Sequence, residues 1–170
     1  MFTECKSYLV EHLKAAGIKS NPFTSMAALS KSMESHIGAV LFEKETLLRN
    51  GSKTQFIEDG ARKKRRKVFD RKLSFTVIIG EYTDEAVEAI YEKFIASLEA
   101  GLYVDGNYIA IEAEEAEWIE KDDSILKSKL AVQVMITFDG GIYRDTDFKK
   151  LTGLEVVSVE KGKEPSQDGN

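Results

Sequence analysis

The sequence predicts an α+β fold with a mainly antiparallel sheet and two main helices packed on one face. Apolar residues recur at helical spacing in residues 2–16 and 84–102. They alternate with polar residues in residues 71–80 and 130–138, as in strands that bury one face. Turn dipeptides are frequent and helices are few, which favours hairpin-connected strands over parallel βαβ units.

Length and composition are those of one folded domain. The chain has 170 residues, of which 42% are hydrophobic and 31% charged, and its formal net charge is -5. We predict a single domain over residues 1–145 that carries an exposed basic loop around residues 50–70. Residues 146–170 are expected to form a C-terminal extension whose last ten or so residues are disordered.

The first elements are predicted from apolar spacing. Residues 2–16 form a helix with one apolar stripe, and Gly17 follows as a C-cap. Residues 22–35 are compatible with either a loop or a short helix. The apolar run over residues 37–43 predicts a central strand. Asn50-Gly51 then predicts a tight turn that leads into a return strand.

The second half of the chain predicts a helix and a hairpin. Thr83 is a suitable N-cap for the helix over residues 84–102, and Gly101 offers a left-handed cap near its end. An Asp-Gly turn follows, and residues 109–119 and 129–138 form the closing hairpin. Asp139-Gly140-Gly141 is expected to bend the chain, and residues 154–159 are compatible with a further edge strand.

Signatures of catalysis are missing from the sequence, so we predict no enzyme activity and no catalytic, cofactor-binding or metal-binding residue. Gly80 stands alone before the second helix, which excludes a glycine-rich phosphate loop. His12 and His36 are far apart, and the single cysteine, Cys5, lies on an apolar stripe. A nucleophile would require Cys5 or a serine to meet a histidine in space. No cofactor is expected.

The amino-terminal segment and the cysteine content predict a location. Charged residues follow Met1 closely, so no secretory signal is expected, and no apolar stretch approaches the length of a membrane span. One cysteine excludes an intramolecular disulfide and is compatible with the reducing cytosol. We therefore expect a cytosolic protein with no membrane partner.

Two clusters of like charge are the strongest local anomalies. The basic cluster is a run of six cations: Arg62, Lys63, Lys64, Arg65, Arg66 and Lys67. Mutual repulsion favours an exposed segment, which is either a solvated loop, a contact for an acidic protein surface or a contact for nucleic-acid phosphate. The acidic cluster surrounds a predicted hairpin tip and includes Glu114, Glu115, Glu117, Asp122 and Asp123.

The opposite charges of the clusters suggest that they pair, within one subunit or between neighbours. A head-to-tail contact between two different surfaces closes into a ring when the rotation permits. We predict that these eleven residues form such an interface. Complementary charge would set its register and encounter rate.

The order of elements resembles the tail terminator and tail-completion (minor tail) proteins of long-tailed bacteriophages, of the lambda type. The matching segments are residues 2–16, 37–43, 71–80, 84–102 and the hairpin 109–119 with 129–138. Residues 117–123, which lead into strand 130–138, are the most family-like part. The resemblance covers residues 1–143 and includes no diagnostic motif. The basic segment 50–70 and the C-terminal extension depart from the family pattern.

The resemblance implies a structural protein that forms a hexameric ring, caps the finished tail tube and joins it to the head connector. Its partners would be itself, the tail tube protein and the head-tail connector protein. It would be present in the bacterial host cytoplasm during assembly and then in the virion. The alternative is a nucleic-acid-binding module that contacts DNA through residues 62–67.

Overall fold

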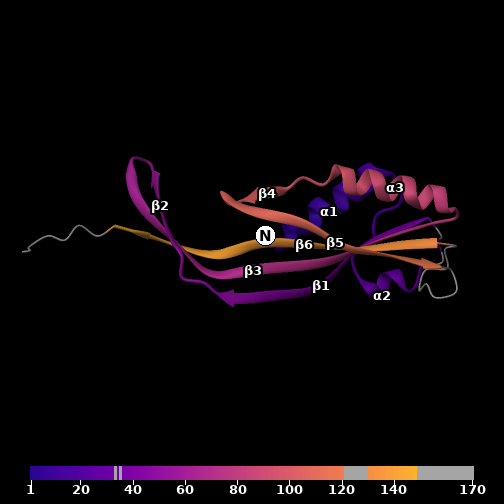
Figure 1. The fold of residues 1–170 in the computed structure, drawn as a ribbon, viewed down its shortest axis with the longest axis horizontal. Helices are drawn as coiled ribbons and strands as arrows, with labels where there is room; N and C mark the ends of the chain where they lie inside the picture. The colour runs from indigo at the N-terminus through magenta and orange to yellow at the C-terminus, as the bar shows by residue number, and fades with distance from the viewer. Residues whose placement is uncertain (33, 35, 121–129, 149–170) are drawn as a thin grey trace, which may run out of the picture.

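The computed structural model describes residues 1–32, 34, 36–120 and 130–148 (Figure 1). The fold is α+β, as the sequence predicts, with a six-stranded sheet in which every strand pair is antiparallel. The sheet order is β1-β3-β6-β5-β4, and β2 also pairs with β3. The elements are α1 (Phe2–Ala16), α2 (Met26–Leu29), β1 (Ile37–Arg49), β2 (Lys53–Glu58), β3 (Ala61–Glu81), α3 (Asp84–Ser97), β4 (Gly101–Val104), β5 (Asn107–Glu120) and β6 (Leu130–Asp147).

The helices begin where the sequence predicts, but α3 ends early. Gly17 ends α1 with a φ of 130°, and the Thr83 hydroxyl accepts a hydrogen bond from the Ala86 N–H at the start of α3. The predicted cap at Gly101 is wrong, because α3 stops at Ser97 and Gly101 begins β4. A Cβ at Gly101 would lie 2.4 Å from the Tyr108 ring. Glycine is therefore required there for close packing of β4 on β5.

The turn predicted at Asn50-Gly51 is also wrong. β1 pairs with β3 as far as Arg49, and β2 resumes pairing with the same strand from Lys53. The hairpin turn is instead Asp59-Gly60, where φ is 51° and 75°. Two consecutive positive φ values are the geometry of the two-residue turn that aspartate-glycine favours. Asn50-Gly51 is thus a break between two strands that both pair with β3.

The bend predicted at Asp139-Gly140-Gly141 does not occur. β6 continues through both glycines to Asp147, and Gly141 pairs with Asp70 of β3. A Cβ at Gly141 would lie 2.4 Å from the Lys67 side chain. The glycines therefore admit neighbouring side chains and leave the strand unbroken. The suggested strand over residues 154–159 lies outside the described residues.

The main hydrophobic cluster joins α1 and α3 to alternate residues of the long strands. Leu9 and Leu13 of α1 and Val87 and Phe94 of α3 are fully buried in it. The strand residues of this cluster include Leu73, Phe75, Val77, Ile79, Val132, Val134, Ile136 and Phe138. The 3.6-residue and two-residue periodicities seen in the sequence thus meet in one core.

A second, smaller cluster lies on the other face of the sheet and includes strand residues that alternate with those of the main cluster. Leu29 of α2 packs there with Ile37, Ala39 and Leu41 of β1 and with Ala131 of β6. The helix α2 is short, and its N-cap is Ser25, whose hydroxyl accepts a hydrogen bond from the Ala28 N–H. No helix in the described part of the chain is long and apolar enough to cross a bilayer.

One end of the sheet extends beyond both clusters as a three-stranded arm. We define the arm as residues 50–68, which contain β2 and the first part of β3, together with residues 142–148, which contain the end of β6. In Figure 1 the arm lies at the left and points away from the helices. Neither cluster includes a residue of the arm. The arm is therefore held by backbone pairing and by polar and aromatic side-chain contacts, without a hydrophobic core of its own.

Candidate functional site

The basic cluster does not form the loop predicted around residues 50–70. Arg62 to Lys67 are consecutive residues of β3 and pair with β2 on one side and with β6 on the other. Mutual repulsion within the run predicts an exposed segment, and a loop is one form of it. Alternation in the strand instead sends successive side chains to opposite faces, so that each face carries only half of the charge.

One face of the arm is neutralised within the chain. Arg65 donates hydrogen bonds from Nε and an Nη to both carboxylate oxygens of Asp145, at 2.8 and 2.6 Å. Its guanidinium also lies 4.8 Å from the centre of the Phe56 ring. Lys67 pairs with Asp70 at 2.7 Å. These hydrogen bonds lower the pKa values of Asp145 and Asp70 below their ordinary range.

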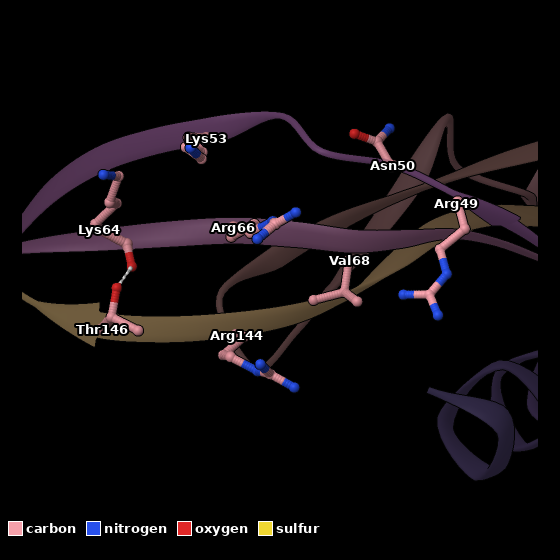
Figure 2. Close-up of a pocket in the computed structure, with 8 residues that line it drawn as sticks. All are labelled: Arg49, Asn50, Lys53, Lys64, Arg66, Val68, Arg144 and Thr146. Atoms are coloured by element: carbon pink, nitrogen blue, oxygen red, sulfur yellow. Dashed lines mark hydrogen bonds between the residues drawn. The ribbon is translucent and has the colours of Figure 1, made fainter.

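The other face of the arm carries a concentration of cations. Arg66 pairs across the sheet with Lys53 on β2 and with Arg144 on β6, so three cations lie in one row across three strands. We call these three residues the cationic row. A shallow pocket of about 590 Å³ lies beside it (Figure 2). Its lining is Arg49, Asn50, Lys53, Lys64, Arg66, Val68, Arg144 and Thr146, with no acidic side chain.

The cationic row has no compensating partner among the described residues. Lys53, Arg66 and Arg144 are exposed and form no ion pair there. Like charges directly opposite each other in a sheet destabilise it. Repulsion among these cations therefore destabilises this face of the arm. The opposite face, which carries Arg65 and Lys67, is neutralised.

Sequence reasoning missed three residues of this surface. Arg49, Lys53 and Arg144 lie outside the run of six cations. Strand pairing places Lys53 and Arg144 on either side of Arg66, and Arg49 lines the same pocket. A lone cation such as Arg144 carries no local signal. Only the register between β3 and β6 reveals it.

Three residues of the acidic cluster, Glu114, Glu115 and Glu117, lie on β5. A bulge between Ala113 and Ala116 places Glu114 and Glu115 together opposite β6. Glu114 accepts a hydrogen bond from the Thr137 hydroxyl at 2.6 Å, and Glu117 accepts one from the Gln133 amide at 2.6 Å. Asp122 and Asp123 lie outside the described residues.

Glu115 and Glu117 border a second pocket, of about 600 Å³, on the face of the sheet opposite the main cluster. Glu115 and Glu117 form one rim and Glu43 of β1 forms the other. The apolar side chains of Met26, Leu41, Ile78 and Met135 lie between the rims, and the remaining lining residues are Thr76, Ala116, Gln133 and Val134. We call this pocket with its rims the acidic groove.

The basic and acidic surfaces are remote from each other within one chain. The groove meets β6 at Gln133 and Met135, and the cationic row meets it at Arg144. At about 3.3 Å per residue, the strand between them is roughly 30 to 36 Å long. In addition, Arg144 lies on the same face of β6 as the core residue Phe138, whereas Gln133 lies on the opposite face. The structure thus does not bring the predicted interface residues together within a subunit.

The histidines do not form a nucleophilic pair. His12 Nδ1 lies 3.0 Å from the Ser97 hydroxyl, but that hydroxyl donates its proton to the Phe94 carbonyl at 2.7 Å. His12 must then act as the donor, which is the reverse of a general base. His36 contacts the buried carboxylate Glu81 and accepts from the Lys19 N–H.

Two further chemistries receive no support from the described residues. Cys5 is fully buried, and burial raises the pKa of its thiol to about 11, so the reactive thiolate is suppressed. In the part of the chain that the structure describes, no group of three or more histidine, cysteine, aspartate or glutamate side chains is arranged to hold a metal ion.

The chain matches no protein-family model, and no curated protein matches it significantly. The geometry and charge of the two surfaces are therefore the basis for a functional proposal.

Proposed function

We propose that this protein is a structural assembly protein of a phage or prophage tail. Copies of the chain would form a hexameric ring that ends the tail tube and joins it to the head connector. The mechanism is geometric, since a closed ring occupies the surface to which the next tube subunit would bind.

The observation that carries the proposal is the arm. It extends from the folded body, contributes nothing to either hydrophobic cluster and has an exposed cationic face. An element of this kind adds little to the stability of one chain but offers a large contact surface to a neighbour. The succession of α1, β1, an elongated hairpin, β3, α3 and a closing hairpin is also the order expected for a tail terminator.

We further propose that α1 and α3 together cover one face of the sheet. Both helices contribute to the main cluster, whereas α2 contributes to the smaller one. The middle of the opposite face then remains available for contact with other subunits, which agrees with the position of the acidic groove.

Native mass spectrometry tests the assembly function. The purified chain is measured alone and together with the tail tube protein of the same genome. We expect a single closed oligomer, a hexamer, in at least one condition, and binding to tube ends in electron micrographs. A monomer in both conditions, with bare tube ends, would contradict the proposal.

A second candidate, binding of DNA, is favoured by the cationic row. Lys53, Arg66 and Arg144 are suitably exposed to contact phosphates, and no carboxylate lines their pocket. Fluorescence anisotropy with labelled duplex DNA tests this candidate. The candidate would be supported if the logarithm of the association constant fell linearly with the logarithm of the salt concentration, with a slope of about 0.9 per phosphate contact. Assembly without measurable DNA affinity would exclude it.

A further inference from the structure

We infer that the cationic face of the arm binds the acidic groove of a second copy of this chain. The inference rests on the proposed assembly function and names the surfaces through which it would operate. Three features of the structure argue for a copy of the chain as the partner, in preference to nucleic acid.

The first feature is charge. The arm presents the cationic row, and the groove presents Glu43, Glu115 and Glu117. The side chains of Glu43 and Glu115, like those of the cationic row, form no hydrogen bond or ion pair among the described residues. Contact between the two surfaces would relieve repulsion within each of them.

The second feature is an exposed apolar residue near the tip of the arm. Ile57 is 72% exposed and shares the parity of Lys53 on β2. Phosphate offers such a side chain nothing, whereas the floor of the groove is apolar, with Leu41, Ile78 and Met135. An apolar contact inside a charged rim is the usual anatomy of a protein–protein interface.

The third feature is width. Lys53, Arg66 and Arg144 span two strand spacings, or about 10 Å. The rims of the groove lie on β1 and β5, which β3 and β6 separate, so they are three spacings or about 14 Å apart. The cationic row therefore fits between the two acidic rims.

Because the two surfaces lie roughly 30 Å apart along β6 and on opposite faces of the sheet, the arm of a chain cannot occupy its own groove. Each copy offers its arm to one neighbour and its groove to another, which is a heterologous contact. Ion pairing within the chain divides the predicted basic residues into two groups. Lys64 and Arg66 belong to the contact, whereas Arg65 and Lys67 are held by Asp145 and Asp70 in their own chain.

Paired charge reversals test the inference. The arm variant is Arg66→Glu with Arg144→Glu, and the groove variant is Glu115→Lys with Glu117→Lys. Matched controls on exposed positions elsewhere are Lys31→Glu with Lys93→Glu, and Glu88→Lys with Glu92→Lys. Sedimentation velocity is run in whichever condition the parent protein assembles, and protection of the Cys5 thiol confirms that each variant is folded.

We expect the arm variant and the groove variant each to associate about tenfold more weakly than the parent, or worse. Both controls should assemble normally. An equimolar mixture of the two variants should regain assembly, because each reversed surface then meets its reversed complement.

Each other outcome overturns the inference in a distinct way. If the arm variant assembles like the parent, the contact is wrong although the assembly function stands. If that variant assembles but loses affinity for labelled DNA, the cationic face binds phosphate. A parent that stays monomeric with and without tail tube protein overturns both the inference and the assembly function.

Discussion

Arg65 and Arg66 are neighbours in the sequence but have opposite surroundings. Arg65 is paired with Asp145 and lies over the Phe56 ring, whereas Arg66 lies between two other cations. The difference follows from strand alternation and from residues that are distant in the chain. The role of one charged residue in a run of like charges can therefore be assigned only when its cross-strand partners are known.

The contrast predicts different effects of alanine on stability. Arg65→Ala should lower the free energy of unfolding by about 1 kcal/mol, because it removes an exposed ion pair and a cation–π contact. Arg66→Ala should change it by less than about 0.5 kcal/mol or raise it, since cross-strand repulsion is relieved. Urea denaturation of the two variants provides the comparison. Equal losses would show that the two faces are equivalent.

Cys5 should be unreactive in the native protein. Burial raises the pKa of the thiol to about 11, so at pH 8 little thiolate is present and reagents have no access to it. Ellman's reagent should therefore label the folded chain only at the rate of unfolding, and label it completely in denaturant. Because the chain has one cysteine, the signal is unambiguous. Rapid labelling of the native state would contradict the buried position.

At the scale of elements, the glycines of the arm have different roles. Gly60 has a φ of 75° in the hairpin turn, whereas Gly51 has no positive φ and a Cβ there would meet nothing within 4 Å. Gly60→Ala should destabilise the arm by about 1–2 kcal/mol. Gly51→Ala should be neutral or stabilising by about 0.5 kcal/mol. Amide hydrogen exchange in β2 measures both effects, and the opposite ranking would refute the turn assignment.

The arm should also loosen in acid before the body does. Hydrogen bonds from Lys67 and Arg65 lower the pKa values of Asp70 and Asp145 in the folded state. Their contribution is thus fully present above the unfolded value of about 3.9 and is lost as pH falls through the folded values. NMR spectra recorded from pH 6 to pH 2.5 should show β2 amides broadening before those of the core strands.

The matched control for the acid effect is Asp70→Asn with Asp145→Asn. This variant should have a less stable arm at pH 6 and little further change in acid. Parent spectra in which the arm and the core lose their signals together would show that these carboxylates do not hold the arm.

The elements that sequence predicts well are those whose evidence is local. The spacing in α1 and the alternation around Phe75 and Ile136 specify both the element and its buried face. Turn positions are less secure, since Asn50-Gly51 and Asp59-Gly60 are equally good turn dipeptides. Pairing with β3 decides between them, and that pairing involves residues far away in the chain.

The charged surfaces show the same limit. The run of cations was visible in the sequence, and so were Glu115 and Glu117. The cationic row was not visible, because Lys53, Arg66 and Arg144 come from three strands. Repulsion within the run also suggested a loop, since the neutralising partners Asp70 and Asp145 are contributed by the strand itself and by β6.

At the scale of the whole molecule, the assembly should depend on salt. Contacts between exposed charges weaken as the Debye length falls to about 3 Å at 1 M salt. We therefore expect the oligomer to dissociate, at fixed protein concentration, as sodium chloride rises toward about 1 M. Light scattering across the salt series measures this. An oligomer unaffected by salt would indicate an apolar interface instead.

The break between β1 and β2 has a consequence for engineering. Arg49 and Phe69 are cross-strand partners, and Asn50-Gly51 directly follows Arg49. Excision of residues 52–68 would leave this dipeptide as a two-residue connection between paired positions, which is the preferred link for a tight hairpin. Asn50-Gly51 could thus join β1 directly to the rest of β3 in a shortened chain that retains every core residue. Such a chain would keep the acidic groove but would lack the arm that binds the groove of a neighbour.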